Sequence, residues 1–457
     1  MKALICSTSL IAACGGGGGA HPLPDAPPGP DAAAACAPSE IIATHQGTIA
    51  ASETWASGVH RVTGSVTVSG GTLTIAPCTE VRLVAGASIT INPAAAALVA
   101  EGSDAEPIRF VRDAAAQPWG HLLATAPARI SLAHAALVGG GTAGDYKTAE
   151  ELGATIEVRG GGAAAPPAVL AVDHVTVDGS SGIAVFLNAA RFAPGSTALT
   201  ITRAGFHPIL LGADSATELP DGAYTGNGVD AILLQSAGTS AAFEQTRPIA
   251  ADTVLHDRGV PYQVGVLPTA IAVGDGIAGH PLATLTIEAG ATLAFVPQTP
   301  GTSSRLQVRT AGSLVVAGTA AHPVTFTSSA AAPAPGDWQG IEFRNALDPS
   351  SHIDHAAITY AGGASFAVGV CEWKAGSGDR AELAAVIISV PDGDQPAAGM
   401  ISNTSFAHSA GAAIYRGWRA ADVDLQPTNT FADIAGCLET DVPNASNACP
   451  ATACPSL

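Results

Sequence analysis

The chain has 457 residues, of which 47% are hydrophobic, and it carries 38 acidic against 19 basic side chains for a formal net charge of −19 at pH 7. An acidic excess of this size excludes nucleic acid and other polyanions as partners of the surface as a whole, although net charge does not describe a local patch. Beyond the N-terminal residues no stretch approaches the roughly 18 apolar residues of a spanning helix, so none is predicted in the mature chain.

The first predicted element is an export signal at residues 1–13. A positive charge at Lys2 precedes an apolar run that is far shorter than the roughly 20 residues of a spanning helix. The sequence Ile-Ala-Ala-Cys that ends at Cys14 resembles the lipobox of bacterial lipoproteins, in which the cysteine is acylated and becomes the new N-terminus. The resemblance implies an exported lipoprotein attached to a membrane through Cys14. The outer membrane or the cell surface is favoured because Gly15 is not an aspartate, and the alternative is an ordinary signal with an accidental cysteine.

Residues 14–39 are predicted to form a flexible stalk. The segment "GGGGGAHPLPDAPPGPDAAAACAP" is rich in Gly, Pro and Ala and offers too little apolar side-chain volume to bury a core. A lipid followed by such a stalk would hold a folded body away from the membrane.

Residues 40–436 are predicted to fold into a solenoid of short strands. Runs such as "SVTVSG", "TLTIAP" and "PIRFV" alternate apolar and polar residues and are separated by Gly or Pro. A sandwich would require regular hairpin turns, whereas these breaks are irregular and favour coiling in one direction. With about 20 to 25 residues per coil the body would have roughly 16 to 18 coils. At about 4.8 Å per coil it would be on the order of 80 Å long.

An internal repeat supports the solenoid. The residues TLTI occur at 72–75 and again at 284–287, and "ALVAEGSDAEPIRFV" is followed two hundred residues later by the similar "SLVVAGTAAHPVTFT". Trp119 of the first copy matches Trp338 of the second. A matched tryptophan is predicted to be structural, wedged over the core at a corner, with sugar stacking as the alternative.

At this point the chain resembles a known family. Residues 252–363 resemble the right-handed parallel β-helix domains of bacterial surface and secreted proteins, and the first copy from Thr54 to Gly141 matches them less cleanly. The resemblance implies an all-β, right-handed parallel β-helix from residue 40 to 436, followed by a cysteine-containing tail at 437–457. It rests on five segments: "GVPYQV" (259–264), "TLTIEAG" (284–290), "GSLVVAGTAAHPVTFTS" (312–328), "DWQGIEF" (337–343) and "HAAITYAGG" (355–363).

Six cysteines remain once the signal peptide and Cys14 are set aside. An even number in an exported chain favours disulfides, and position along the chain suggests three pairings. The spacings lack a CxxC pair, which disfavours the alternative of a zinc site. The suggested pairs are Cys36–Cys78, between stalk and early coils, Cys371–Cys437, in the last coils, and Cys449–Cys454, in the tail.

Enzymes of this fold class carry motifs that are absent here. Pectate-lyase-like enzymes need a base near carboxylate-held calcium, and polygalacturonase-like enzymes need clustered carboxylates. The chain contains no Asp-Asp pair, no Gly-His-Gly and no Arg-Ile-Lys. The Asp-Gly-Asp at residues 392–394 resembles a fragment of a calcium loop but lacks further oxygen ligands, so no cofactor is predicted.

A histidine-containing segment in the second copy is a candidate site. His352 and Asp354 would share one strand face, with His355 on the other, as a partial metal or acid/base set. However, His355 matches His134 of the first copy. A position that recurs with the coil pattern is predicted to hold a stacked or wall-packed histidine, and no metal site is predicted.

Five side chains near the C-terminus have no counterpart in the repeat and are the candidate ligand contacts. They are Trp373 in "CEWK" and Tyr415, Arg416, Trp418 and Arg419 in "IYRGWRA". Trp, Tyr and Arg dominate binding hot spots, and a flat ring can stack on a pyranose. The alternative is a cap over the last apolar coil, and the two roles are compatible.

The sequence therefore predicts a lipid-anchored, non-catalytic β-helix with a structural or adhesive role, toward carbohydrate or another surface protein. A polysaccharide lyase or glycosidase on the same fold is the second hypothesis, and a pure scaffold is the third. A groove lined by at least two carboxylates and an arginine would favour the enzyme.

Overall fold

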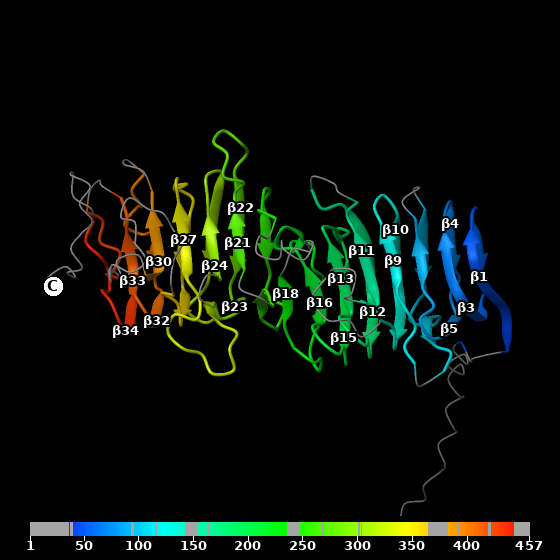
Figure 1. Ribbon diagram of the computed structural model, residues 1–457. Helices are drawn as coiled ribbons and strands as arrows, with labels where there is room; N and C mark the ends of the chain where they lie inside the picture. The colour runs from blue at the N-terminus through cyan, green and yellow to red at the C-terminus, as the bar shows by residue number, and fades with distance from the viewer. Residues whose placement is uncertain are drawn as a thin grey trace, which may run out of the picture.

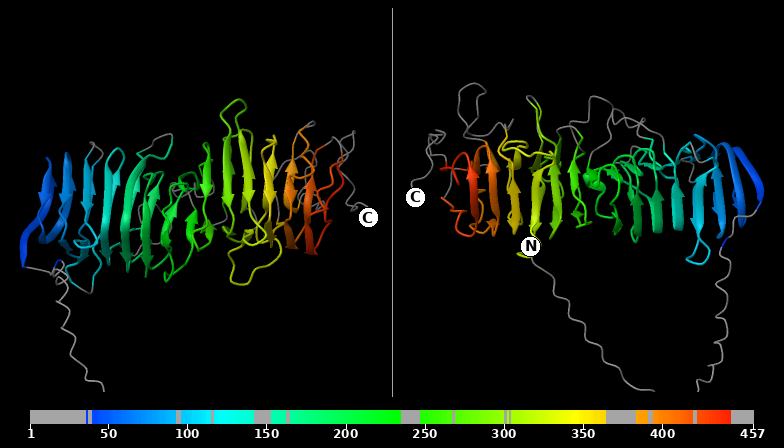
Figure 2. Two further views of the ribbon diagram at one scale, coloured as in Figure 1. Left: turned by 180° about the vertical axis from the view of Figure 1, so that it is seen from behind. Right: turned by 90° about the horizontal axis from the view of Figure 1, so that it is seen from below.

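The computed structural model describes Cys36 and residues 40–92, 96–114, 117–141, 153–161, 165–234, 247–266, 269–299, 302, 304–363, 383–390, 394–418 and 422–442. Strands stack along one long axis, with the N-terminal strands at one end and the C-terminal strands at the other (Figure 1, Figure 2). Neighbouring strands pair in parallel throughout, so the predicted parallel β-helix is confirmed. No helix among the described residues is long and apolar enough to cross a bilayer.

The N-terminal coils are triangular, and their strands form three columns that run along the axis. The first column contains β2 (Glu53–Trp55), β4 (Thr72–Ile75), β7 (Ala97–Glu101), the first halves of β10 (Arg129–Val138) and β12 (Ala168–Asp178), and β14 (Arg191–Phe192). The second contains the first half of β3 (Gly58–Val68), β5 (Thr79–Leu83), β8 (Ile108–Arg112), the second halves of β10 and β12, β15 (Thr197–Thr202) and β17 (Gly222–Ala223).

The third column runs along almost the whole body. It contains the second half of β3, β6 (Ile89–Ile91), β9 (Leu122–Thr125), β11 (Ile156–Arg159), β13 (Val185–Asn188), β16 (Ile209–Leu211), β18 (Ile232–Leu234), β20 (Tyr262–Val264), β23 (Thr292–Phe295), β26 (Val324–Ser328), β29 (Ala356–Thr359), β32 (Ser405–Ser409) and β34 (Thr430–Ile434). β1 (Ile41–Ile49) pairs with both halves of β3 and so ends the stack.

In the C-terminal coils two separate sheets flank the third column. One contains β19 (Thr253–Leu255), β22 (Ala283–Glu288), β25 (Gly312–Ala317), β28 (His352–Asp354) and β31 (Ile401–Ser402). The other contains β21 (Ala270–Val273), β24 (Arg305–Val308), β27 (Gly340–Arg344), β30 (Ala384–Ser389) and β33 (Ala412–Arg416). A 3-10 helix, η1 (Ala213–Ser215), lies between β16 and β17.

The core is a set of aliphatic ladders. Because side chains alternate along a strand, every second residue points inward and meets the equivalent residue of the next coil. In the first column Leu73, Leu98, Ile130 and Leu170 follow one another in register, and none is more than 1% exposed. Burying each such side chain contributes about 1.5–3 kcal/mol, so the ladders are the main stabilising feature of the solenoid.

The two copies of the sequence repeat do not occupy the same faces. The first copy places β7, β8 and β9 in the first, second and third columns, whereas the matching β26 of the second copy lies in the third column, in line with β9 rather than β8. The sequence pattern is therefore rotated by one face between the copies. A triangular coil permits this, because a strand-corner-strand pattern can begin on any of its three faces.

The coils also differ in length. Leu199 lies beside Gly222, about two dozen residues later, whereas Ile358 lies beside Phe406, nearly fifty residues later. The expected coil of about 20 to 25 residues describes the short coils only, since long connections separate strands elsewhere. The expected number of coils was consequently too high.

The N-terminal end is secured by a disulfide and a ring stack. Cys36 and Cys78 form a disulfide, which confirms that predicted pair. On β1, His45 stacks on Trp55 with ring centroids 3.9 Å apart and donates through Nε2 to Nδ1 of His60 at 2.8 Å. His60 in turn donates through Nε2 to the carbonyl of Ala56 at 2.8 Å. The bond between the rings needs one of the two nitrogens to act as an acceptor, so it is lost when both imidazoles are protonated.

The N-terminal end of the solenoid should therefore be less stable at low pH. Burial lowers the pKa of both His45 and His60 below the ordinary 6.5, so each contributes stability that is complete above pH 6.5 and is lost as the pH falls through the folded-state pKa. We expect amide protons of β1 to exchange faster at pH 5 than at pH 7.5 relative to those of β26, after correction for intrinsic rates. His45→Gln should reduce this difference, and equal protection of β1 at both pH values would contradict the prediction.

Candidate functional site

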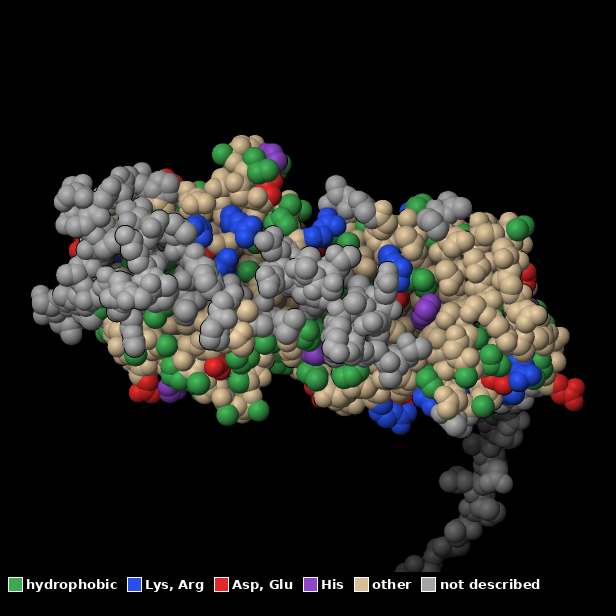
Figure 3. Space-filling model, in the orientation of Figure 1, with side chains coloured by type: hydrophobic (Ala, Val, Ile, Leu, Met, Phe, Trp, Pro, Cys, Tyr) green, Lys and Arg blue, Asp and Glu red, His purple; other side chains and the backbone are tan. Residues whose placement is uncertain are grey.

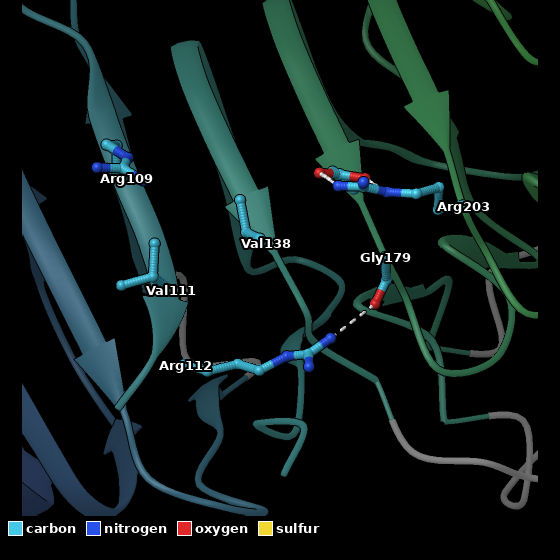
Figure 4. A pocket seen from close by; sticks show the side chains of 7 residues that line it. Arg109, Val111, Arg112, Val138, Gly179 and Arg203 are labelled. Atoms are coloured by element: carbon cyan, nitrogen blue, oxygen red, sulfur yellow. Dashed lines mark hydrogen bonds and ion pairs between the residues drawn. The ribbon is translucent and has the colours of Figure 1, made fainter. Parts of the chain in front are cut away.

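A cavity of about 460 Å³ opens on the outer face of the second column. Along β8 the side chains of Ile108 and Phe110 point into the core and are fully buried, so Arg109 and Val111 point outward. Figure 4 shows the valines on neighbouring strands and the arginines around them. The lining residues are Arg109, Val111 and Arg112 from β8, Val138 from β10, Asp178 and Gly179 at the end of β12, and Arg203 after β15.

Asp178 and Arg203 form a bidentate ion pair at one side of the cavity. Arg203 donates through Nε to Oδ1 at 2.7 Å and through Nη2 to Oδ2, and Thr202 adds a bond to Oδ1 at 3.2 Å. The hydrogen bonds from Arg203 lower the pKa of Asp178 below its usual range. Asp178 is therefore ionised at neutral pH and held in place, which makes it a poor general acid.

Arg112 spans the corner of the coil. Its Nε donates to the carbonyl of Gly139 at 3.0 Å and its Nη2 to that of Gly179 at 3.3 Å. Gly139 has a φ of +72°, and a Cβ at this position would lie 1.7 Å from Nε of Arg112. The glycine thus provides the space that fixes this guanidinium at the cavity.

A row of arginines on β3, β5 and β8 lies beside the cavity, where Arg82 pairs with Val111 and Arg61 with Arg82. Arg109 and Arg82 both bond to Glu80, through Nη1 at 3.2 Å and Nε at 2.6 Å. Arg61 bonds to Asp113 through Nη2 at 2.7 Å. We call the outer surface that holds Arg61, Arg82, Arg109, Arg112 and Arg203 the arginine face.

The residues that line the cavity can bind an anion but offer little for acid/base catalysis. Guanidinium groups bond to carboxylates and sulfates in fixed, often bidentate geometry, and side chains such as Val111 and Val138 present apolar surface to a ring. A glycosidase needs two carboxylates at a set separation, whereas Asp178 is the single carboxylate that lines the cavity. The groove expected of an enzyme is therefore not formed by these residues.

A second polar group lies on the outer side of β24 and β27, where Figure 3 shows blue side chains gathered. Glu342 is fully buried there, accepts a bond from Nε2 of Gln307 at 2.7 Å, and lies 3.7 Å from both Arg305 and Arg344. Burial lowers the pKa of Arg305 below its ordinary value. With one carboxylate among several cations, this group resembles a buried ion network rather than a catalytic pair.

The C-terminal candidate residues that the structure describes are buried. Tyr415 is 1%, Arg416 4% and Trp418 0% exposed. Trp373 and Arg419 lie outside the described residues.

The remaining predicted cysteines are described only in part. Cys437 is disulfide-bonded. Its expected partner Cys371, the expected pair Cys449 and Cys454, and the lipidation candidate Cys14 all lie outside the described residues.

The histidine segment of the second copy is an ordinary corner of the coil. Asp354 accepts bonds from Asn403 at 2.8 Å, Ser402 at 2.7 Å and His355 at 2.9 Å. Partial burial raises the pKa of Asp354, but these bonds outweigh it and lower the pKa to about 2. His352 points away and bonds to the carbonyl of Ser350.

Comparison with known proteins supports the fold and leaves the activity open. Residues 274–364 match the pectate-lyase-like beta helix domain. The matched pectate-lyase-like segment includes β22 to β29 and overlaps, in all but its last residue, the region 252–363 whose sequence resembles bacterial β-helices. The arginine face lies before it. No curated protein and no solved structure matches the chain.

Sequence reasoning missed the arginine face. Its signal is present in the strands "HRV", "VRL" and "IRFVR", where Arg61, Arg82 and Arg109 occupy outward positions. Arg61 and Arg82 lie side by side, and Glu80 pairs with Arg109. Aligning successive coils, rather than the two distant copies, would have brought these residues together.

Proposed function

We propose that the protein is an exported, lipid-anchored β-helix that binds an acidic polysaccharide on its arginine face without cleaving it. The observation that carries the proposal is the cavity in which three arginines surround Val111 and Val138 in a chain with a net charge of −19. Arginines gathered on one face of an acidic protein form a local site for an anion that the rest of the surface repels.

The chemistry of the cavity fits a uronate or a sulfated sugar. The apolar face of a pyranose can rest on Val111 and Val138, while its carboxylate or sulfate meets Arg109 or Arg112. Successive coils repeat at about 4.8 Å, so an extended glycan can follow the row of arginines along the axis. Neutral glycans would lack the charged contacts and are expected to bind weakly.

The anchoring part of the proposal rests on the N-terminal sequence. A lipid on Cys14 and a stalk over residues 14–39 would display the solenoid at the outer membrane or the cell surface. Binding without cleavage is supported by the state of Asp178, which is ionised and bonded to Arg203.

The test uses the mature chain with Cys14→Ser, which removes the lipid attachment and retains the described residues. It is titrated with polygalacturonate, alginate, heparin and neutral dextran. We expect binding to the acidic polymers that weakens with added salt. Arg109→Gln should weaken it roughly tenfold, because it removes a charge-assisted bond. Arg203→Gln should also weaken it, because the variant leaves the negative charge of Asp178 in the cavity without its cationic partner.

Arg129→Gln is the matched control. Arg129 is exposed on β10, in the first column and thus on another face of the same coils, so the variant should bind as well as the parent. Binding to dextran as strong as to the acidic polymers, or equal binding by all variants, would refute the proposal. Each polysaccharide is also incubated with the protein, with and without calcium, and assayed for newly formed polysaccharide chain ends. Their appearance would establish that the protein is a lyase or a glycosidase instead.

A further inference from the structure

Two histidines and two aspartates meet at the corner between the first and second columns, outside the arginine face. The rings of His134 and His174 stack with centroids 4.9 Å apart and planes inclined by 5°. Nδ1 of His134 lies 2.8 Å from Asp104, and Nδ1 of His174 lies 2.7 Å from Asp173. One ligand atom from each of His134, Asp173 and His174 lies within 4.8 Å of the others.

The fold creates this cluster. β10 and β12 each pass from one column to the next through a histidine with positive φ, 42° at His134 and 50° at His174. Ala133 pairs with Asp173 and Ala135 with Val175, so the two corner histidines are equivalent positions of adjacent coils. The stacked histidine expected at position 134 is present, and its partner is forty residues away in sequence.

We propose that His134, His174 and Asp173 form a binding site for a divalent transition-metal ion, with Asp104 as a positioning residue. Asp104 accepts the Nδ1–H of His134, which leaves Nε2 of that ring as the metal ligand. A carboxylate behind a ligating imidazole fixes the ring and raises its basicity. Two imidazoles and one carboxylate favour Zn²⁺, Cu²⁺ or Ni²⁺ over the harder Ca²⁺ and Mg²⁺.

The geometry is close to that of a metal site. The candidate ligand atoms all lie within 4.8 Å of one another, and those of a tetrahedral Zn²⁺ lie roughly 3.4 Å apart, given bond lengths of about 2.1 Å, so small side-chain rotations complete the site. The side chains of His174 and Asp173 are 59% and 48% exposed, which leaves them free to rotate. Water would complete the coordination at this open corner.

The experiment titrates Zn²⁺ and Co²⁺ into the whole mature chain carrying Cys14→Ser, in chelator-treated buffer at pH 7.5. Isothermal titration calorimetry measures the Zn²⁺ affinity, and the visible absorption of Co²⁺ reports nitrogen and oxygen ligands. We expect saturable binding of one ion. Asp104→Asn should weaken binding roughly 10- to 100-fold, and His174→Asn should weaken it at least as much.

His408→Asn is the matched control. His408 also has a positive φ of 55°, lies 3.2 Å from Asp433 and stacks on Tyr360, but belongs to no three-ligand group among the described residues. Asparagine tolerates positive φ at both positions, so neither variant should strain the backbone. The control should bind Zn²⁺ like the parent. No saturable binding by the parent, or equal affinity in the His174 and His408 variants, would overturn the proposal.

Discussion

Trp338→Ala is expected to destabilise the protein by about 3–5 kcal/mol, the range for removing a fully buried tryptophan. Trp338 is 0% exposed, and its ring stacks on Phe295 with centroids 4.2 Å apart. Its Nε1–H donates to the carbonyl of Thr359 on the next coil at 2.8 Å. The alanine variant therefore loses packing and leaves a partly buried carbonyl without this donor. Chemical denaturation followed by circular dichroism measures the loss.

Two further variants show whether the cause is the packed ring or its hydrogen bond. Trp338→Phe retains much of the ring volume and should cost less, because mainly the bond of about 0.5–1.5 kcal/mol is removed. Trp119 is also fully buried and donates to Val138 at 2.9 Å, so Trp119→Ala should cost about as much as Trp338→Ala. A loss below about 1 kcal/mol for either alanine variant would contradict a structural role.

The equivalence of these tryptophans shows what the repeat could predict. Trp119 and Trp338 were matched by sequence, were expected to be structural, and occupy the same position relative to their strands. The fold class followed from the same pattern, because alternating short strands without hairpin turns can bury their apolar residues by coiling. Local periodicity is determined by adjacent residues and is therefore readable from sequence.

The lateral neighbours could not be predicted in the same way. Which strands lie side by side depends on the number of residues in each coil. That number varies: Gly222 follows its lateral neighbour Leu199 by about two dozen residues, whereas Phe406 follows Ile358 by nearly fifty. The arginine face and the pair His134 and His174 both arise from such lateral pairing. They leave no motif of fixed spacing, so both were missed.

The C-terminal aromatic and arginine residues illustrate a different difficulty. The residue types favoured in binding sites are also those that fill the irregular end of a solenoid. Arg416 is 4% exposed, and its Nε lies 3.2 Å from Glu439, which is 2% exposed. Sequence alone does not distinguish a buried ion pair from an exposed ligand contact, because both use the same side chains.

Arg416→Ala is expected to cost about 3–5 kcal/mol at pH 7.5, the range for breaking a buried ion pair on one side. Arg416 also donates to the carbonyls of Thr440 and Val423, so the variant leaves several acceptors and the charge of Glu439 unpaired. The measurement is the free energy of unfolding by denaturant. Loss comparable to that of an exposed arginine such as Arg129 would contradict the buried pairing.

The pH dependence of this variant tests the cause. Burial already raises the pKa of Glu439, and the charge of Arg416 opposes that rise. Without Arg416 the pKa rises further, so folding takes up a proton and the stability lost at pH 7.5 is partly regained as the pH falls through the raised folded-state pKa. Arg416→Met with Glu439→Gln removes both charges, while the glutamine amide retains acceptors for Leu425 and Gln426. This double variant should be more stable than Arg416→Ala at pH 7.5 and should show little recovery at pH 5.5. An equal deficit of Arg416→Ala at both pH values would mean that lost packing, rather than an unpaired buried carboxylate, is the cause.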